Sequence, residues 1–163
     1  MPEGWIHCYL KEVISLVSGN DLERSKYWEK PVGIPYITGA SNFINSNIET
    51  SRYTDEKYCN SYYGDILLTC KGTVGKIGYN KYEKAHVARQ IMALKAFINN
   101  KYLIILLNFN IPNLAKKAKS IIPGIERRDL LYLSIQLPPL GEQESISIAT
   151  NNCLECIKQI SNN

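Results

Sequence analysis

Short apolar segments, separated by glycine, proline and polar residues, recur along most of the chain, and this pattern is typical of β-strands joined by turns. The segments predicted to be strands, or to contain one, are residues 33–43, 65–70, 74–80, 89–97 and 133–137. Residues 10–19 fit either a short helix or a strand that stops at Gly19. Residues 43–62 are polar, aromatic and rich in Asn and Ser, which predicts a long surface loop.

Three other segments have helical character. Residues 101–110, "KYLIILLNFN", are predicted to form a buried helix that ends at Pro112, because proline has no backbone N–H donor. Residues 114–120, "LAKKAKS", predict a short basic helix, and residues 124–132 contain a helical turn. Because strands and helices are mixed without a regular βαβ alternation, we predict an α+β domain with a twisted mixed or antiparallel sheet.

The C-terminal segment has a different period. From Glu142 onwards apolar residues recur at spacings of three and four, which is the seam of a heptad repeat. The seam consists of Ile146, Ala149, Cys153, Cys156 and Ile160. It covers about two heptads, whereas a sustained coiled coil has three or four. We therefore predict one domain over residues 1–140, followed over residues 141–163 by the start of a longer coiled-coil helix or by a short helix that pairs with a partner.

The composition suits a globular domain in the cytoplasm. Hydrophobic residues make up 45% of the 163 residues, which is enough for one core. The longest apolar run, Leu103 to Leu107, is too short to cross a bilayer, and the N-terminal residues lack the pattern of a secretory signal. The chain has five cysteines, an odd number without a dense framework, so we interpret them as reduced thiols.

The charges are unevenly distributed along the chain. Between Lys71 and Arg128 there are twelve Lys or Arg and two acidic residues, a net charge of +10, whereas the rest of the chain carries −6. Such a basic block is the electrostatic footprint of a polyanion-binding protein. The alternative is a set of solvated surface lysines, and charge alone does not separate the two interpretations.

The stretch "GDILLTCKGTVGKIGYN", residues 64–80, has the glycines of a nucleotide-binding loop but fails both nucleotide motifs. A phosphate loop requires Ser or Thr after its Gly-Lys pair, and here Ile77 follows Gly75 and Lys76. Cys70 also stands where that motif requires its first glycine, and no helix follows, as a dinucleotide site would need. We interpret the stretch as a tight turn between two strands.

Other catalytic and metal-binding patterns are weak. The Cys153-x-x-Cys156 pair lies on the predicted helix seam without a second cysteine pair, and His7 and His86 lack the spacing of metal ligands. The "LPPL" at residues 137–140 lacks the polar and aromatic neighbours of amino-methyltransferase sites, and E-x-K, the common metal-nuclease signature, does not occur. The sequence therefore predicts no catalytic residue, metal or cofactor.

Several segments, taken together and in order, resemble one target-recognition domain of a type I restriction-modification specificity subunit. They are "GIPYITGASNF", "GDILLTCKGTVGKIGYN", "AHVARQIMAL", "YLIILL" and "SIIPGIERRDLLYLSIQLPPLGEQ". The resemblance extends from Trp5 to about Ile160. Its most specific part is the Pro-Pro-x-x-Glu-Gln run, which in that family joins a recognition domain to a long helix.

The resemblance implies binding to double-stranded DNA and a role in directing methyltransferase and restriction subunits to their target. S-adenosylmethionine and ATP would belong to those subunits, so the chain itself would need no cofactor. Members of the family usually carry two recognition domains joined by two long helices. The chain would then be a fragment or a half-length subunit, paired through its C-terminal helix with a second recognition domain or with a second copy of itself.

DNA recognition requires phosphate contacts for affinity and base-edge contacts for sequence. The residues predicted to contact DNA are Lys71, Thr73, Lys76, Lys84, His86, Arg89, Gln90, Lys116, Lys117, Lys119, Asn42, Arg52 and Tyr53. Arg89 and Gln90 are expected to begin a strand and to face opposite ways, so that one of them reads a base. For Tyr36 and Tyr53, packing at the sheet surface is the alternative to a base or sugar contact.

Two other classes of function are open at this point. The chain could be a basic scaffold that binds RNA or an acidic protein without reading duplex DNA, or an enzyme whose active site follows no familiar motif.

Overall fold

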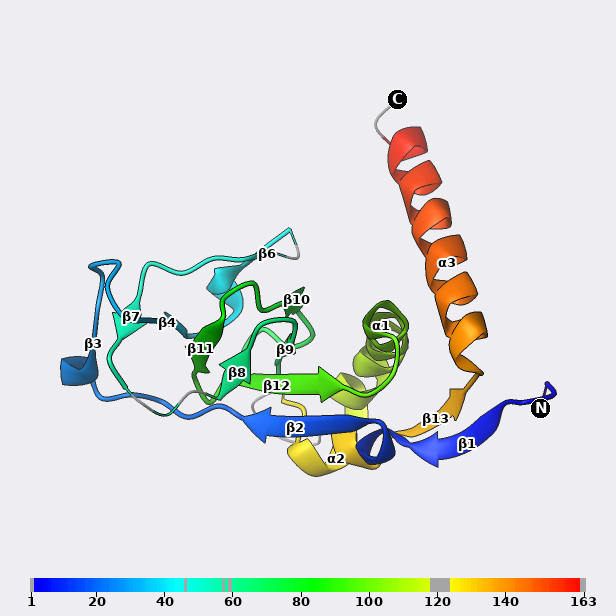
Figure 1. The fold of residues 1–163 in the computed structure, drawn as a ribbon, viewed down its shortest axis with the longest axis horizontal. Helices are drawn as coiled ribbons and strands as arrows, with labels where there is room; N and C mark the ends of the chain where they lie inside the picture. Colours follow the sequence, from blue (N-terminus) through cyan, green and yellow to red (C-terminus); the bar gives the residue numbers. More distant parts are fainter. Residues whose placement is uncertain (1, 46, 57, 59, 118–123, 162–163) are drawn as a thin grey trace.

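The computed structural model describes residues 2–45, 47–56, 58, 60–117 and 124–161. Figure 1 shows the strands of two larger sheets lying next to one another, α1 (Asn100–Lys117) beside the end of β12 (Ile91–Ala96), and α3 (Leu140–Ser161) standing out from the rest of the fold. The predicted α+β class, with mixed and antiparallel pairing, is confirmed.

The central sheet has four antiparallel strands in the order β10 (Ile77–Tyr79), β9 (Ile66–Thr69), β12 (Ile91–Ala96) and β2 (Ile14–Ser18). β9 and β10 form the predicted hairpin, with Leu68 opposite Ile77. β12 was also predicted, and its residues Ile91 to Leu94 are all buried. Its burial on both faces follows from its position between two hydrophobic clusters.

Successive side chains of β9 and β12 enter different clusters, as the two-residue period of a strand requires. Leu68 and Leu94 enter the larger cluster, together with side chains of β2, α1 and β13. Leu67 and Ile91 enter the smaller cluster, together with Ile37, Val87 and other side chains of the second sheet. The hairpin and β12 are therefore held from both sides, which gives their connecting turns a rigid base.

The second sheet has five strands in the order β3 (Tyr27–Trp28), β7 (Tyr53–Thr54), β4 (Ile34–Ile37), β11 (Lys84–Val87) and β8 (Ser61–Tyr62). β11 runs parallel to β4, and the other pairs in this sheet are antiparallel. β5 (Phe43–Ile44) and β6 (Asn47–Ile48) form a separate small hairpin.

The long surface loop predicted for residues 43–62 is wrong in part, because this segment contributes β5, β6, β7 and β8. Each of these strands has two residues, too few to produce an alternating pattern. Phe43 and Ile48 are buried in the smaller cluster. The polar composition of the segment conceals these few buried positions.

α1 spans Asn100–Lys117 and continues through Pro112, which corrects the prediction that it ends there. The separate basic helix predicted at residues 114–120 is the last part of α1, and residues 118–120 lie outside the described part of the chain. Leu107 and Ile111 before the proline, and Leu114 after it, all pack on the larger cluster. This packing offsets the backbone hydrogen bond that Pro112 cannot make.

The first and last strands lie side by side. β1 (Ile6–Tyr9) pairs antiparallel with β13 (Ser134–Leu137), and His7 Nε2 lies 2.6 Å from Ser134 Oγ. The predicted helical turn before β13 is α2 (Arg127–Leu131). The remaining elements are 3-10 turns at Leu10–Glu12, Arg24–Lys26 and Ala40–Asn42.

α3 spans Leu140–Ser161 and is anchored through its first turn. Gln143 is 4% exposed; its Nε2 donates to Pro138 O (2.9 Å) and its Oε1 accepts from the backbone N of Asn99 (3.0 Å). Asn99 in turn accepts bonds from the first N–H groups of α1, at Lys101 and Tyr102. One side chain therefore joins the end of β13, the start of α3 and the N-terminal cap of α1.

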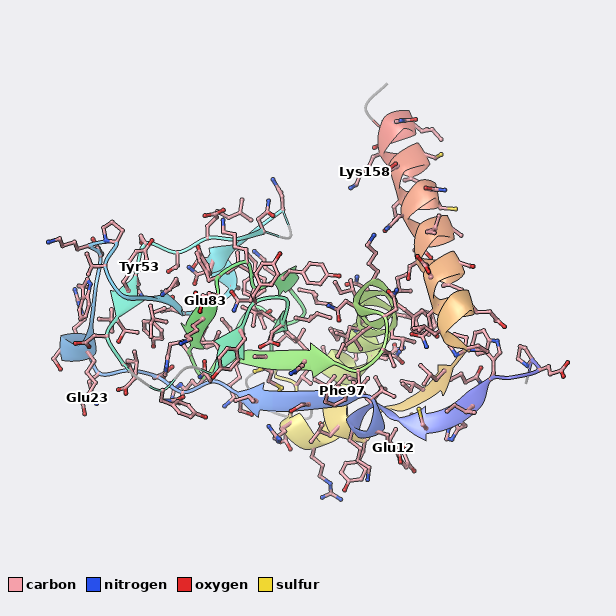
Figure 2. The ribbon with its side chains drawn as sticks, viewed as in Figure 1. Glu12, Glu23, Tyr53, Glu83, Phe97 and Lys158 are labelled. Carbon is pink, nitrogen blue, oxygen red and sulfur yellow. The ribbon has the colours of Figure 1, made fainter. Side chains whose placement is uncertain are left out.

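Beyond its first turns α3 leaves the domain. Trp5 Nε1 donates to Glu142 Oε2 (2.8 Å) and Ser147 is buried, but every residue from 151 to 161 is exposed. Figure 2 shows Lys158 on this projecting part. Of the predicted seam, Ile146 is half-buried and Ala149, Cys153, Cys156 and Ile160 are exposed. Within the described residues, nothing covers the outer half of the seam.

Candidate nucleic-acid interface

Three chain connections meet at the end of the central sheet where β9 finishes and β12 begins. They are residues 38–43 after β4, residues 70–76 between β9 and β10, and residues 88–90 between β11 and β12; we call these together the turn cluster. Cys70 N donates to Gln90 O (2.8 Å), and Lys76 Nζ donates to Ala40 O (3.1 Å). Segments far apart in the sequence are thus bonded into one surface.

Two glycines allow this close assembly. Gly75 has φ +93°, in the region that favours glycine, and a Cβ there would lie 3.0 Å from Ile111 Cγ2 of α1. At Gly39 a Cβ would lie 2.6 Å from Gln90 Oε1, so the absence of a side chain lets residues 38–43 approach residues 88–90. The interpretation of residues 64–80 as a tight turn between strands is confirmed, because β10 follows the turn and no helix does.

The lysines of the turn cluster are on the surface. Lys71, Thr73 and Lys76 are exposed. Lys76 is also tied to its surroundings, because its ammonium group reaches the carbonyl oxygens of Ala40 and Phe43. Its charge therefore reinforces the cluster as well as adding to its positive potential.

The last turn of α1 adds positive charge at the same end of the fold. Ile111 of this helix packs beside Gly75, and Lys116 lies five residues further on and is exposed. Lys117 is the last residue of α1, and Lys119 lies outside the described residues.

Arg89 and Gln90 occupy the turn before β12 instead of its first positions, which corrects the expectation that they alternate across a strand. Both are exposed. Arg89 Nε lies 2.9 Å from Asp21 Oδ2, and Asp21 Oδ1 accepts a bond from the backbone N of Arg89 (3.1 Å). The turn therefore presents two long polar side chains, one of them held by a carboxylate.

Asn42, which was predicted to contact DNA, makes hydrogen bonds within the domain. Its Oδ1 accepts bonds from the backbone N of Thr38 (2.9 Å) and Gly39 (3.1 Å), and its Nδ2 donates to Glu49 O (2.7 Å). The amide edge that would pair with adenine is thus used to shape residues 38–43.

Arg52 lies at the side of this loop and is half-buried. Its Nη1 donates to Thr38 Oγ1 (3.4 Å), and its guanidinium carbon lies 5.6 Å from the centre of the Tyr27 ring. Arg52 is therefore joined to the loop that Asn42 shapes.

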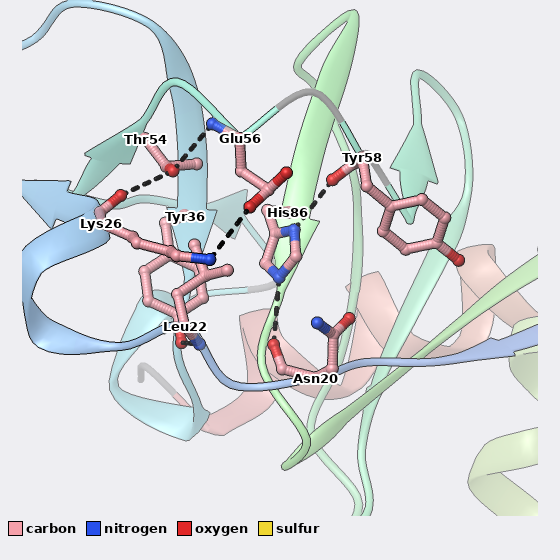
Figure 3. A network of polar contacts seen from close by, with 8 residues as sticks. All are labelled: Asn20, Leu22, Lys26, Tyr36, Thr54, Glu56, Tyr58 and His86. Carbon is pink, nitrogen blue, oxygen red and sulfur yellow. Dashed lines mark hydrogen bonds and ion pairs between the residues drawn. The ribbon is translucent and has the colours of Figure 1, made fainter.

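His86 is buried, so the predicted DNA contact is wrong for this residue. Figure 3 shows its ring between two backbone carbonyl oxygens, Tyr58 O at 3.0 Å from Nδ1 and Asn20 O at 3.0 Å from Nε2. Carbonyl oxygens only accept, so both contacts are hydrogen bonds only when both ring nitrogens carry a proton. The imidazole lies between the backbone at Asn20 and the backbone at Tyr58 and does not reach the surface.

The tyrosines divide between packing and partial exposure. Tyr36 is 3% exposed, accepts a bond from Leu22 N (3.1 Å) and lies edge-on to His86, and burial raises the pKa of its hydroxyl. The packing alternative is therefore the one observed for Tyr36. Tyr53 is half-buried in β7, and Lys84 is exposed at the start of β11. Both belong to the second sheet and not to the turn cluster.

Sequence reasoning missed two residues that organise this geometry. Asp21 holds Arg89 from 68 positions away, and Gln143 holds Asn99 from 44 positions away. Asp21 lies in no local pattern, and the Pro-Pro-x-x-Glu-Gln run that contains Gln143 does not by itself signal a contact with Asn99.

The described residues contain no group of three or more His, Cys, Asp or Glu side chains that could hold a metal ion. The same residues also include no helix that is both long enough and apolar enough to cross a membrane. The described cysteines, Cys8, Cys70, Cys153 and Cys156, are thiols without disulfide partners.

The family model described as "Type I restriction modification DNA specificity domain" matches residues 2–162 of the chain. A curated relative, the putative type I restriction enzyme MjaX specificity subunit of Methanocaldococcus jannaschii, is 23% identical over 153 residues. The match covers 90% of this chain but only 36% of that relative.

Solved structures share the fold. The HsdS subunit from Thermoanaerobacter tengcongensis superposes with a TM-score of 0.89 at 23% identity, over 99% of this chain and 40% of the other. A chain from a structural study of complex assembly and conformational transition of the type I R-M system also gives 0.89, at 22% identity, over 99% of this chain and 41% of the other. The S subunit from M. genitalium gives 0.63 at 19% identity, over 97% and 41%. The chain thus corresponds to about two fifths of each of these larger proteins.

Proposed function

The chain belongs to the family of type I restriction modification DNA specificity domains, and we propose that it reads a DNA sequence on behalf of a type I restriction-modification system. The observation that carries this proposal is the family match over residues 2–162. The turn cluster supports it, since it gathers exposed lysines with Arg89 and Gln90, the residue types that contact phosphates and base edges in duplex DNA.

In this proposal the chain carries out no chemistry of its own. Methyltransferase subunits would modify the target and a restriction subunit would cleave DNA, each using its own cofactor, in the cytoplasm. The recognition domain, residues 1–140, would bind double-stranded DNA, and residues 141–163 would begin the spacer helix. That helix would pair with a second recognition domain or with a second copy of the chain.

The test uses the full subunit assembled with its methyltransferase subunits and a library of duplexes with a randomised segment. We expect repeated selection to enrich one sequence, and the affinity for that sequence to fall steeply as salt concentration rises. Enrichment of no sequence would overturn the proposal.

The rival proposal, a basic scaffold for RNA or an acidic protein, gives a different result in a competition assay. A scaffold of that kind would bind structured RNA or an acidic polypeptide of equal charge as well as it binds duplex DNA. Either competitor would therefore displace the DNA. A duplex reader keeps the enriched sequence in the presence of either competitor, because base-edge contacts in the major groove are absent from both.

Neutralising Lys116 in the last turn of α1 and two lysines that follow it in the sequence is expected to weaken binding to all duplexes alike. The triple variant Lys116→Gln, Lys117→Gln and Lys119→Gln removes three positive charges. The slope of log affinity against log salt should fall by about one unit for each phosphate that the variant no longer neutralises. Fluorescence anisotropy at several salt concentrations measures both the affinity and the slope.

The matched control neutralises lysines at the opposite end of the central sheet. Lys95, near the end of β12, and Lys101, in the first turn of α1, are both exposed. Lys95→Gln with Lys101→Gln should leave the salt slope close to that of the natural chain. Equal slopes for the triple variant and the natural chain would show that the end of α1 faces away from DNA.

A further inference from the structure

The contact between Asp21 and Arg89 has the geometry of a support for a base-reading arginine. The carboxylate holds Arg89 at two points: Oδ2 meets the side-chain Nε at 2.9 Å and Oδ1 meets the backbone N at 3.1 Å. The Arg89 side chain is nevertheless 69% exposed. An exposed ion pair contributes little to stability, so the contact is better explained by what it does to the position of the guanidinium.

Both partners stand on fixed backbone. Asn20 N donates to Val87 O (3.0 Å), which ties the segment leading to Asp21 to the end of β11. Ile91 N donates to Ala88 O (2.9 Å), which closes the turn that carries Arg89. Rigid placement of a reading group matters because little conformational entropy is lost when it binds.

The way Arg89 is held leaves the end of its guanidinium available. Asp21 engages Nε, and among the described residues neither Nη1 nor Nη2 of Arg89 has a hydrogen-bond partner. These two nitrogens form a fork of parallel donors. Such a fork matches the O6 and N7 acceptors of guanine in the major groove.

The charge of the pair argues for a base contact over a phosphate contact. Arg89 and Asp21 together are neutral, and the carboxylate would repel a nearby phosphate. A base edge carries no net charge, so the pair can approach it without that penalty. Lys71 and Lys76 in the same cluster are not paired with a carboxylate among the described residues, and they suit phosphates better.

We infer that Asp21 is a specificity-determining positioning residue, which orients Arg89 to read one guanine in the major groove of duplex DNA. The inference deepens the proposed function and rests on it. It adds a residue from the acidic part of the chain to a surface otherwise recognised by its positive charge.

The first experiment uses the full subunit with its methyltransferase subunits and the sequence enriched from the randomised library. Each guanine of that sequence is replaced in turn by 7-deazaguanine, which lacks the N7 acceptor. At one guanine the natural protein should lose at least about fivefold in affinity, within the range of about 5- to 150-fold for a bidentate pair. Arg89→Ala should bind the unmodified sequence more weakly by a similar factor and should be indifferent to 7-deazaguanine at that position.

The Asp21→Asn variant distinguishes an effect on the orientation of the Arg89 guanidinium from an effect on folding. It preserves the shape of the side chain but weakens its hold on Nε. We expect at least about fivefold less preference for guanine at the same base pair, while affinity for unrelated duplexes stays equal or rises because a negative charge has been removed. A merely structural role would lower both affinities together.

Two comparison variants complete the test. Gln90→Ala should keep the 7-deazaguanine response and change preference at a different base pair. Arg89→Lys should not restore the guanine preference, because an ammonium group lacks the fork. The salt slope should be unchanged in Arg89→Ala, in contrast to the triple lysine variant.

The possible failures are distinguishable. A natural protein that enriches no sequence overturns the proposed function and this inference with it. An enriched sequence without guanine, or one whose 7-deazaguanine response survives in Arg89→Ala, overturns the inference alone. So does an Asp21→Asn variant with unaltered guanine preference.

Discussion

Gln143→Leu is expected to lower the free energy of unfolding by about 2–4 kcal/mol and to loosen the direction in which α3 leaves the domain. Gln143 is buried and satisfies two backbone groups, Asn99 N–H and Pro138 C=O. Leucine has a similar volume but neither a donor nor an acceptor, so both groups are left without a partner away from water. Each unsatisfied group costs about 1–3 kcal/mol.

Urea unfolding followed by circular dichroism measures the change in stability. Gln159→Leu is the matched control: it makes the same substitution on the same helix at an exposed position, and it should change stability by no more than about 0.5 kcal/mol.

The direction of α3 needs a separate measurement. Spin labels at Cys156 and at Lys84→Cys, with the other cysteines replaced, report the distance from the exposed end of α3 to the second sheet. We expect Gln143→Leu to broaden this distance distribution. If stability falls while the distance distribution is unchanged, Gln143 stabilises the core but does not fix the direction of α3. The contact between Trp5 and Glu142 would then fix that direction.

The consequence for function is geometric. If α3 begins the spacer of a recognition subunit, its angle sets where the turn cluster lies relative to the methyltransferase subunits. Gln143 belongs to the Pro-Pro-x-x-Glu-Gln run that carries the resemblance to the family. In the structure the side chain of Gln143 joins β13, α1 and α3 at one point through its two hydrogen bonds.

The elements predicted well from sequence are those with a strong local signal. These elements contain enough apolar positions, bounded by turn residues, to show the period of a strand or a helix. They are β9, β10, β12, β13 and α3. The hairpin turn at residues 70–76 was recognised because its glycines fit neither the phosphate-loop motif nor the dinucleotide motif. These local features also placed Lys71 and Lys76 correctly on one turn.

The elements predicted poorly depend on contacts distant in the sequence. α1 passes through Pro112 because Ile111 and Leu114 pack on the sheet, and a local rule for proline does not contain that information. The burial of His86 depends on carbonyl groups at residues 20 and 58. The role of Asn42 likewise depends on its contacts with Thr38 and with Glu49, seven residues away.

The candidate interface shows the same division. Residue type correctly selected Arg89 and Gln90 as exposed polar side chains, but their placement on a strand was wrong, because β12 begins at Ile91, two residues after the predicted start at Arg89. Asp21 was not selected, since an acidic residue does not match the charge expected of a DNA-binding surface. Its relevance follows only from the two contacts with Arg89.

Placing aspartate on the seam of α3 is expected to abolish pairing of this helix while leaving the domain folded. The helix has 22 residues, a length of about 33 Å, and its outer half is exposed on all sides. An isolated helix of this length is marginally stable in water, so a partner that covers the seam would stabilise it. The seam as predicted is lined by Ile146 and Ile160, and the structure adds Ile157, which is 60% exposed on nearly the same face.

The change to test is Ile146→Asp with Ile160→Asp, together with a second pair, Ile157→Asp with Ile160→Asp. The second pair is needed because Ile146 is half-buried where α3 leaves the domain, whereas Ile157 and Ile160 are both exposed. Both pairs should retain the folded signal of residues 5–140 by circular dichroism. Both should lose self-association in sedimentation and binding to methyltransferase subunits, because a carboxylate buried between helices is left without a partner.

Ile148→Asp is the control, because Ile148 is exposed on the same helix but lies more than a third of a turn away from Cys153 around its axis. It should assemble like the natural chain. The thiols of Cys153 and Cys156 provide an independent readout: both are exposed in the single chain and should react at once with a thiol reagent, then become protected in the assembly. If both aspartate pairs still assemble and both thiols stay reactive, the docking surface for methyltransferase subunits lies on another part of the domain and not on this seam.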